Sequence, residues 1–373
     1  MRRRSLLSSP ALALQLAATA APASSEARTL FAYGDGIPYD PAQYSTLLAK
    51  LTASGQARAD DYSRGGVVEQ LESRMAAMLG KETAVWMPTG TLANHLAVRL
   101  LAGSKRRVAV QAESHLYNDC GDCAQSLSNL NLLPLAPGKA SFSLDELDRA
   151  ATDSVMGRVP APVGAIQIET PVRRRSGERF DFAQMQRISA WARRREIGLH
   201  LDGARLFLES AYSSKPASEY AALFDTVYVS MYKCFNAASG AILAGPRKLL
   251  ADLVHTRRMF GGSLHQSWPS ALVALHHLEG FESRYKAAVR VSEEALAVLS
   301  RDPSFELERI PNGTNVFRLK VPDVNAPVYQ GRLEAAGVSA RPPATAWLTM
   351  QVNETWGQFE AAEIVARFRK ALS

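Results

Sequence analysis

The sequence of 373 residues is poor in cysteine, and after its N-terminal segment it contains no apolar run of transmembrane length. We therefore expect no membrane partner. Two of the three cysteines stand in Cys120-Gly-Asp-Cys123. A C-x-x-C motif can indicate a redox or metal role, but a zinc site needs further ligands at matching spacing, and no second C-x-x-C exists. We predict no metal site and interpret Cys120 and Cys123 as two small residues on a packed helix.

A strong excess of one charge is also absent. The chain has 43 Lys and Arg against 36 Asp and Glu, a formal net charge of +7 that falls to about +4 without the three arginines at positions 2–4. Basic runs at residues 105–107, 173–175 and 193–195 adjoin apolar-periodic sequence and are not interleaved with aromatic residues. This pattern is typical of solvated faces, so we expect no nucleic-acid partner.

Residues 1–23 have the features of a twin-arginine export signal. Arg3 and Arg4 precede an apolar stretch, which ends in an A-x-A cleavage site at Ala21-Pro-Ala23. Signals of this class export proteins that are already folded. We expect the protein to be periplasmic or otherwise exported. If this segment is instead a basic, disordered N-terminus, we expect a cytoplasmic protein.

Between residues 60 and 260, short apolar runs alternate with helical patterns, as in the βαβ units of a parallel sheet. The stretch 181–196 carries apolar residues at three- and four-residue spacing and predicts a crossover helix between two strands. The expected strands cover residues 108–111, 165–168, 198–201 and 226–229, with 240–243 as a fifth candidate.

The pattern changes after residue 260 to a long helical segment at 270–299, followed by mixed short strands and a final helix at 356–372. We predict an α/β fold with two domains: a large domain at residues 24–260, with a mainly parallel sheet flanked by helices, and a smaller C-terminal α+β domain at 261–373. No internal repeat or low-complexity tract is visible.

An acidic residue follows one of the expected strands, in the run His200-Leu-Asp-Gly-Ala-Arg-Leu-Phe207. Ligands in open α/β sheets bind beyond the carboxyl ends of strands. A carboxylate at this position can keep a pyridine nitrogen protonated, which makes the ring an electron sink. Asp202 suits that role. The alternative is a structural ion pair between Asp202 and Arg205 at the strand exit.

A single lysine ends another expected strand. Lys233 lies among apolar and small residues, and burial lowers the pKa of a lysine, so that its neutral amine becomes available for Schiff-base chemistry. Ser230, three residues earlier, can donate to a phosphate from the same turn. The alternative is a solvated loop lysine.

Two further segments complete the candidate site. Thr89, Gly90 and Thr91 open a helix after an apolar run, and free N–H groups at a helix start bind phosphate. An ordinary helix N-cap is the alternative. His115 follows the strand at 108–111, where an imidazole can stack on a cofactor ring and exchange protons with a substrate. A structural histidine is the alternative.

Taken together, these segments resemble the threonine aldolase and β-eliminating lyase family of fold-type-I pyridoxal-phosphate (PLP) enzymes. The resemblance extends from about residue 60 to residue 279, and its most specific motif is H-x-D-G-A-R-L-F. The motifs that carry it are Gly80-Lys-Glu-Thr-Ala84, Pro88-Thr-Gly-Thr-Leu-Ala-Asn94, Ser114-His115, His200-Leu-Asp-Gly-Ala-Arg-Leu-Phe207 and the strand that ends at Lys233.

The resemblance implies a transaminase-like fold and a PLP cofactor. By this resemblance, Lys233 carries PLP as a Schiff base and Asp202 pairs with the pyridine nitrogen. Thr89, Gly90 and Thr91 then hold the phosphate.

The resemblance also implies a reaction and an assembly. Arg205 would bind the carboxylate of an amino acid substrate, and His115 would stack on the ring and act as the base for the β-hydroxyl group. The reaction would be aldol-type cleavage of a β-hydroxy-α-amino acid, threonine for example, into glycine and an aldehyde. The protein would be a homodimer or homotetramer, with Arg257 or Arg258 reaching a neighbouring active site.

The sequence departs from the family pattern at several positions. Tyr232 and Cys234 flank the lysine where the family has Ser and Gly, and residues 347–352 lack the usual second carboxylate-binding arginine, for which Arg341 is a candidate substitute. Residues 169–173 lack a second histidine, and residues 33–39 lack the family's serine.

These departures leave alternative functions open. PLP chemistry could instead bring about β-elimination, racemisation or transamination, or the chain could be a non-catalytic relative. A further alternative takes Ser230 to Lys233 as the S-x-x-K motif of an acylated serine enzyme, but no K-T-G motif follows.

Overall fold

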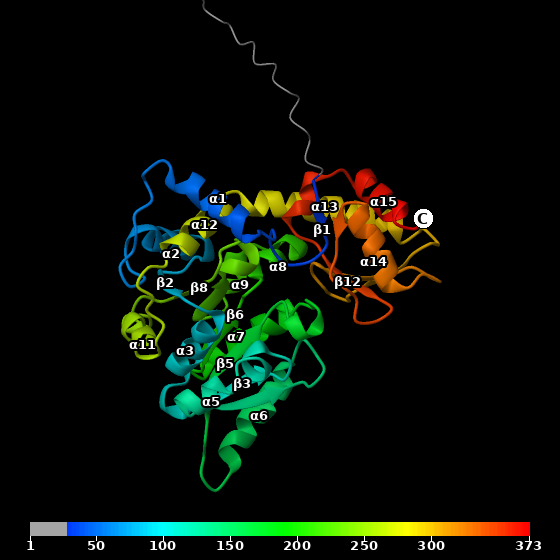
Figure 1. The fold of residues 1–373 in the computed structure, drawn as a ribbon. Helices are drawn as coiled ribbons and strands as arrows, with labels where there is room; N and C mark the ends of the chain where they lie inside the picture. Colours follow the sequence, from blue (N-terminus) through cyan, green and yellow to red (C-terminus); the bar gives the residue numbers. More distant parts are fainter. Residues whose placement is uncertain (1–27) are drawn as a thin grey trace, which may run out of the picture.

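The computed structural model describes residues 28–373, so the predicted export signal at residues 1–23 lies outside the described residues. A seven-stranded sheet forms the centre of the larger part of the molecule (Figure 1). Its order is β2-β8-β7-β6-β5-β3-β4, and all neighbours are parallel except β8, which is antiparallel to both β2 and β7. The strands are β2 (Thr83–Met87), β3 (Arg107–Gln111), β4 (Asn131–Leu135), β5 (Val163–Glu169), β6 (Gly198–Asp202), β7 (Thr226–Ser230) and β8 (Ala241–Gly245).

Both faces of this sheet are buried, which explains the continuous apolar runs in its strands. Helix α7 (Phe182–Arg194) packs on one face together with Leu199 and Leu201 of β6, and α3 (Gly90–Ala102) covers the other face. Because side chains alternate along a strand, His200 and Asp202 point to the α3 side. The mainly parallel α/β sheet and the crossover helix predicted from the sequence are confirmed.

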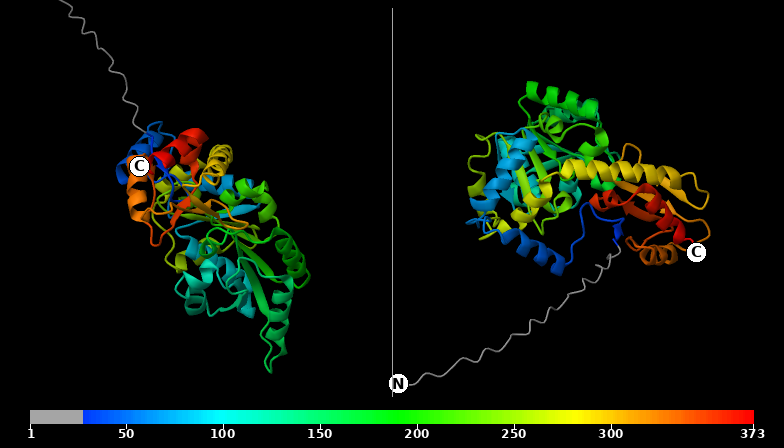
Figure 2. Two further views of the ribbon diagram at one scale, coloured as in Figure 1. Left: turned by 90° about the vertical axis from the view of Figure 1, so that its right-hand side faces the viewer. Right: turned by 90° about the horizontal axis from the view of Figure 1, so that it is seen from above.

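The long helical segment predicted at 270–299 consists of two helices, α12 (Trp268–Leu278) and α13 (Phe281–Leu299). They are separated at Gly280, whose φ of 67° no helix interior adopts. Helix α12 packs against the core of the large sheet, whereas α13 runs on from that core into a second one (Figure 2). The single final helix predicted at 356–372 is likewise a 3₁₀ turn, Glu354–Gln358, followed by α15 (Ala361–Lys370).

The second core belongs to a three-stranded antiparallel sheet and the helices on it. The strands are β9 (Glu306–Arg309), β10 (Val316–Lys320) and β12 (Leu348–Gln351), and the helices are α14 (Ala326–Ala335), α15 and the end of α13. This is the α+β character predicted for the C-terminal part. The domain boundary at residue 260 stays a prediction.

The first described residues belong to this second core. Strand β1 (Leu30–Phe31) pairs in parallel with β11 (Val338–Ser339), and Leu30 and Ala32 are fully buried there. The chain then crosses to the large sheet through residues 33–39 and enters α1 (Pro41–Thr52). The N-terminal segment is therefore held at the junction of the two parts.

Short helices follow several strand ends, and α2 (Gly66–Leu79) and α6 (Leu144–Met156) add to the layers around the sheet. The short helices are α4 (His115–Asn118), α5 (Cys123–Ser128), α8 (Leu206–Ser213), α9 (Ala217–Ala221), α10 (Met231–Cys234) and α11 (Leu253–Met259).

Among residues 28–373, no helix combines the length and the apolar character needed to cross a membrane.

Candidate active site

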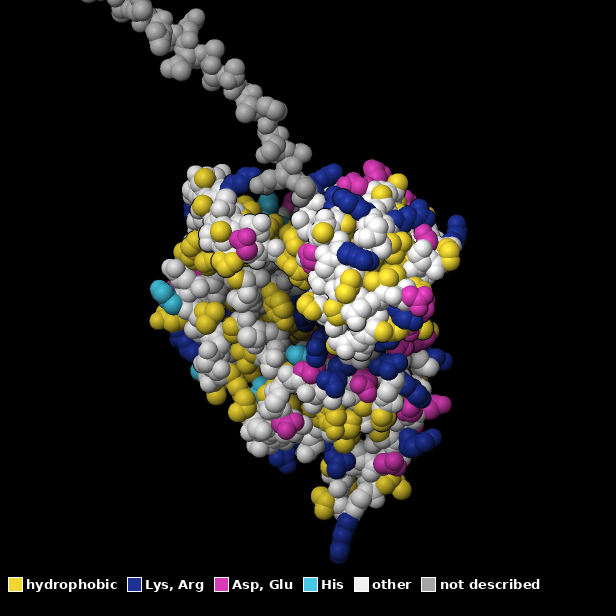
Figure 3. Space-filling model, turned by 45° about the vertical axis from the view of Figure 1, so that its right-hand side comes forward, with side chains coloured by type: hydrophobic (Ala, Val, Ile, Leu, Met, Phe, Trp, Pro, Cys, Tyr) yellow, Lys and Arg dark blue, Asp and Glu magenta, His cyan; other side chains and the backbone are white. Residues whose placement is uncertain are grey.

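The four predicted site segments follow β2, β3, β6 and β7, and these strands all run in the same direction. Their carboxyl ends therefore meet at one edge of the sheet, as ligand sites in open α/β sheets do. A cavity of about 590 Å³ opens at this edge, and Lys233, His115 and Arg205 line it together with Asp35 and Arg341. In Figure 3, dark blue and cyan side chains gather where the surface is hollowed between the two parts.

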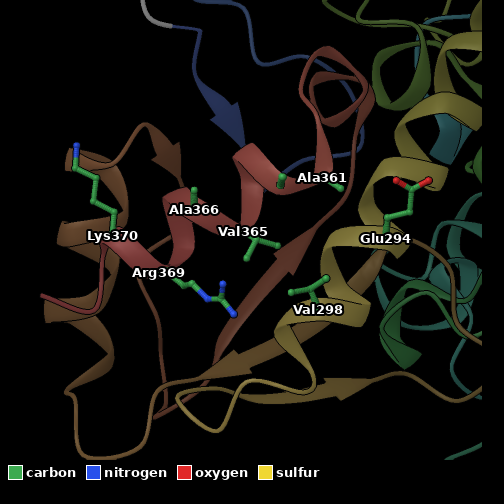
Figure 4. Close-up of a pocket in the computed structure, with 8 residues that line it drawn as sticks. Glu294, Val298, Ala361, Val365, Ala366, Arg369 and Lys370 are labelled. Atoms are coloured by element: carbon green, nitrogen blue, oxygen red, sulfur yellow. The ribbon is translucent and has the colours of Figure 1, made fainter.

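A larger cavity of about 710 Å³ lies elsewhere, between α13 and α15. Figure 4 shows Val298 of α13 facing Val365 of α15 there, with Arg369 and Glu294 at its rim. Small and aliphatic side chains form most of its wall. It brings together no nucleophile, acid and base of the kind found at the strand ends, so the smaller cavity is the candidate active site.

Lys233 lies in the one-turn helix α10, directly after the buried strand β7. Burial lowers the pKa of its amine, and the nearby Arg205 charge lowers it further. Among the described residues its Nζ has no carboxylate within ion-pair distance, and its closest recorded partner is the ring of Tyr232, 5.5 Å from the centroid. Asp202, Asp35 and Glu169 raise the pKa but do not outweigh these two effects. A partly buried amine with no carboxylate in direct contact can lose its proton and act as a nucleophile.

Asp202 ends β6 and is held by a chain of buried hydrogen bonds. Asn94 Nδ2 donates to Asp202 Oδ2 at 2.6 Å, and the Ala204 N–H donates to Oδ1 at 3.2 Å. Asn94 Oδ1 lies 2.8 Å from His200 Nε2, and His200 Nδ1 lies 2.9 Å from Thr226 Oγ1. Burial lowers the pKa of His200 to about 4, so the ring is neutral and its Nε2–H donates to Asn94. This series of hydrogen bonds orients the Asn94 side chain so that its amide nitrogen donates to Asp202.

The cradle predicted at Thr89, Gly90 and Thr91 opens α3. The Thr89 hydroxyl accepts from the Leu92 N–H at 3.2 Å, so Thr89 is an N-cap and its side chain is already engaged. The N–H groups of Gly90 and Thr91 have no partner within the helix and stay available. A Cβ atom at Gly90 would lie 1.9 Å from the Tyr228 hydroxyl oxygen, so only glycine fits at this helix start.

The predicted phosphate donor Ser230 is fully buried, and its Oγ has no hydrogen-bond partner within residues 28–373. An unpaired buried hydroxyl costs about 1–3 kcal/mol. Together with the free N–H groups of α3, this orphaned hydroxyl fits an anionic group at the sheet edge.

His115 opens α4 behind β3. Its backbone N–H donates to Glu169 Oε2 at 2.6 Å, and its Nδ1 lies 3.4 Å from Asp119 Oδ2. The interaction with the Cys120 side chain raises the pKa of His115, although burial opposes this. Glu169 also accepts from the Arg173 N–H at 2.9 Å, and its burial raises its own pKa. Glu169 thus ties together two cavity-lining loops, a role that the sequence analysis missed.

Arg205 is paired with Asp35 rather than with Asp202. Its Nε donates to Asp35 Oδ2 at 2.8 Å. Burial alone would lower the pKa of Arg205, but the Asp35 and Glu169 charges outweigh it and raise the pKa. The predicted alternative, a structural pair with Asp202, is wrong. Because only Nε is engaged by Asp35, the two terminal nitrogens remain for a ligand.

Asp35 is the second residue that the sequence analysis missed. It belongs to residues 33–39, the segment singled out only for lacking the family's serine. Arg341 is the candidate substitute for the second carboxylate-binding arginine. Its Cζ lies 5.8 Å from the centroid of the Tyr33 ring, and it lines the same cavity. Arg257 is fully buried and donates to the backbone oxygens of Trp86 and Tyr62, so it is engaged within its own chain. That Arg257 or Arg258 reaches a neighbouring site stays a prediction.

The model of one protein family, the beta-eliminating lyases, matches residues 49–327. The chain belongs to this family. Every residue predicted for the site, from Thr89 to Lys233, lies inside the matched range, whereas Asp35 and Arg341 lie outside it. The resemblance inferred from the motifs is therefore confirmed.

Individual proteins that are similar to this chain carry the names of different activities. The chain is 26% identical over 249 residues to a low-specificity L-threonine aldolase of Eremothecium gossypii, an alignment that covers 66% of this chain and 64% of the relative. It is 29% identical over 199 residues to an alanine racemase of Cochliobolus carbonum, covering 52% of this chain and 50% of that protein. The chain thus matches between half and two thirds of the length of these relatives.

The similarity to a solved structure covers a larger share of the chain. A candidate L-allo-threonine aldolase of Listeria monocytogenes superimposes with a TM-score of 0.76 at 26% identity, covering 92% of this chain and 96% of that one. This member of the family therefore has the fold-type-I architecture of PLP-dependent enzymes, as predicted.

Proposed function

We propose that this member of the beta-eliminating lyase family binds PLP and cleaves a threonine-like β-hydroxy-α-amino acid into glycine and an aldehyde. The observation that carries the proposal is the meeting of Lys233 and Asp202 at one sheet edge, the amine with a lowered pKa and the carboxylate held by Asn94. The aldolase names of several relatives support the choice of substrate.

The residues at the edge fit each part of PLP. The Lys233 amine would bind its aldehyde group and Asp202 its ring nitrogen, while the start of α3 and the Ser230 hydroxyl would hold its phosphate. When bound, PLP supplies an electron sink for the electron pair of a bond broken at Cα of the substrate. The specificity for one bond must come from the protein.

Arg205 and His115 supply that specificity. The terminal nitrogens of Arg205 bind the substrate carboxylate, and Asp35 fixes the guanidinium through Nε. His115, with Nδ1 directed to Asp119, keeps Nε2 as the acceptor for the β-hydroxyl proton. Loss of that proton allows the bond between Cα and Cβ to break and the aldehyde to leave, and Cα then takes up a proton to give glycine.

The reaction is tested by supplying purified, PLP-loaded protein with threonine, allo-threonine, serine and alanine, and by measuring the released products. Aldehyde and glycine in equal amounts support aldol cleavage. Pyruvate and ammonia would indicate β-elimination, and inverted alanine would indicate racemisation, the activity named for the Cochliobolus relative. Either of these as the main activity would contradict the proposal.

Two properties of the whole protein are proposed with it. We propose export through a twin-arginine signal at residues 1–23 and assembly as a homodimer or homotetramer. N-terminal sequencing of the exported protein should find Ser24 first, and light scattering should give a mass of two or four chains. Full-length protein confined to the cytoplasm, or a monomer, would contradict them.

Replacing Arg205 with alanine should raise KM for the amino acid on the order of 10²-fold, because the carboxylate of the substrate then loses its charged hydrogen-bond partner in the cavity. The dissociation constant of PLP should change far less than KM, because Arg205 holds the substrate directly and acts on the cofactor only through the pKa of Lys233. Arg318→Ala is the matched control, because Arg318 is partly exposed and pairs with Glu308 on the second sheet, outside the cavity lining. Equal weakening of PLP and substrate binding would refute the role of Arg205.

The pH profile should show the titration of His115. A base acts in its neutral form, and the raised pKa of His115 keeps the ring protonated to a higher pH, so kcat/KM should rise with pH through an apparent pKa above the usual value of about 6.5. Cys120→Ala removes the largest raising influence and should move this rise to lower pH. The exposed His255→Gln should leave it in place. A profile that Cys120→Ala does not shift would contradict the assignment.

A further inference from the structure

Cys120 and Cys123 lie at the two ends of a β-turn. The Cys123 N–H donates to the Cys120 carbonyl oxygen at 3.3 Å, and the two central residues, Gly121 and Asp122, have φ of 57° and 51°. Such a turn holds its first and last Cα atoms within about 7 Å. A disulfide spans Cα separations of about 4.4–6.8 Å. Cys120 therefore lies outside the predicted helix, whereas Cys123 opens α5, and both cysteines pack against a small apolar cluster as predicted. The turn limits the Cα separation to about the range that a disulfide can span.

The two thiols are free, partly exposed and close enough for each to shift the pKa of the other. The Cys120 side chain lowers the pKa of Cys123, while the same contact, together with burial, raises the pKa of Cys120. Thiol–disulfide exchange needs one thiol that ionises readily and a second that resolves the mixed disulfide. The third cysteine, Cys234, is fully buried and offers no access to a reagent.

The surroundings of the pair distinguish it from a metal site. Within residues 28–373, no three His, Cys, Asp or Glu side chains are grouped as metal ligands, so the thiols lack the further ligands that zinc requires. Cys120 Sγ lies 3.7 Å from Thr91 Oγ1, and the Cys120 side chain raises the pKa of His115. The pair thus adjoins both the start of α3 and the candidate base.

We propose that Cys120 and Cys123 form a thiol–disulfide exchange site that reacts with low-molecular-weight disulfides of the glutathione type. The Cys123 thiolate attacks one sulfur of the reagent, forming a mixed disulfide and releasing the first thiol. Cys120 then attacks Sγ of Cys123, forming the Cys120–Cys123 bond and releasing the second thiol. The two cysteine sulfurs lose two electrons together, and the reagent disulfide gains them; two protons pass to the released thiols.

The site is independent of the proposed lyase reaction, since it needs neither PLP nor an amino acid. Closure would remove the Cys120 thiol that interacts with His115, so the pKa of His115 should fall in the oxidised protein. Oxidation is therefore expected to act on the candidate active site through one side chain.

The test equilibrates the folded protein with mixtures of reduced and oxidised glutathione, quenches with acid, alkylates the remaining thiols and maps the peptides by mass spectrometry. We expect a Cys120–Cys123 disulfide while Cys234 remains alkylated, with an equilibrium constant about tenfold more favourable than for the same chain in denaturant. Equal constants in both states, or thiols that stay reduced in the most oxidising mixture, would overturn the proposal.

Two variants of Asp122 test the turn itself. Asp122 makes no side-chain cap to α5, and its N–H donates no backbone hydrogen bond among those recorded. Asp122→Gly keeps positive φ accessible and should close the disulfide as the wild type does. Asp122→Pro fixes φ near −65°, so it should stop at the mixed disulfide with glutathione. If the Cys120–Cys123 disulfide formed in the proline variant with an equilibrium constant like that of the wild type, the turn would not be what creates the site.

Discussion

Replacing Lys233 with methionine is expected to abolish covalent capture of PLP, and with it the visible absorbance of the loaded protein and all lyase activity. The reason is that the lowered pKa of Lys233 supplies a neutral amine at the edge where Asp202 and the start of α3 also lie. Methionine preserves most of the volume but carries no nucleophile. The measurement is absorbance after addition of PLP, followed by borohydride reduction and peptide mapping.

Lys81→Met is the matched control. Lys81 is a second partly buried lysine whose pKa is lowered by burial, but its Nζ donates to the Phe224 carbonyl oxygen and it lies outside the candidate cavity. It should lower stability without affecting PLP capture. If borohydride fixed PLP to Lys81, or to any lysine but Lys233 in the wild type, a lowered pKa alone would explain the labelling and the site would be wrong.

Asp202→Asn should lower kcat on the order of 10²–10³-fold, the scale observed when a group aimed at developing charge is removed. An amide cannot hold a positively charged ring N–H, so the electron sink is weakened. The substitution preserves shape and burial, and the protein should therefore fold and still retain PLP through Lys233. Steady-state kinetics with threonine, with PLP content measured in parallel, give the ratio of kcat between the wild type and the variant.

Glu209→Gln is the control for burial. Glu209 is another buried carboxylate, which accepts from the Thr170 hydroxyl at 2.6 Å, and burial raises its pKa to about 7. It takes no part in the chain of hydrogen bonds through Asn94 that holds Asp202. Its neutral isostere should leave kcat close to the wild-type value. A kcat as low as that of Asp202→Asn would mean that any buried carboxylate near the sheet has this effect.

The strands and the placement of the site could be predicted because their signals are local. Buried strands appear as short apolar runs, and polar residues that follow parallel strands must meet at one edge, which is why Asp202, Lys233 and His115 were found together. The partner of Arg205 could not be predicted in this way. Asp35 is 170 residues away and reaches Arg205 only because β1 pairs with β11 at the other end of the chain.

Other features depended on single backbone angles or on packing. The positive φ of Gly280 divides the helical segment at 270–299, although its apolar periodicity continues on both sides. The C-x-x-C motif suggested a helix, but the left-handed Gly121 and Asp122 place Cys120 outside it. Glu169 joins two loops through backbone N–H groups, which leave no mark in the sequence pattern.

The central claim is that one amine and one carboxylate at the ends of β7 and β6 meet the same PLP molecule. A crystal structure of the protein grown with PLP tests it most directly. The account predicts continuous electron density from Lys233 Nζ to the cofactor, with the Asp202 carboxylate in contact with the ring nitrogen and the phosphate at the start of α3. PLP bound through another lysine, or with its ring nitrogen facing away from Asp202, would contradict it.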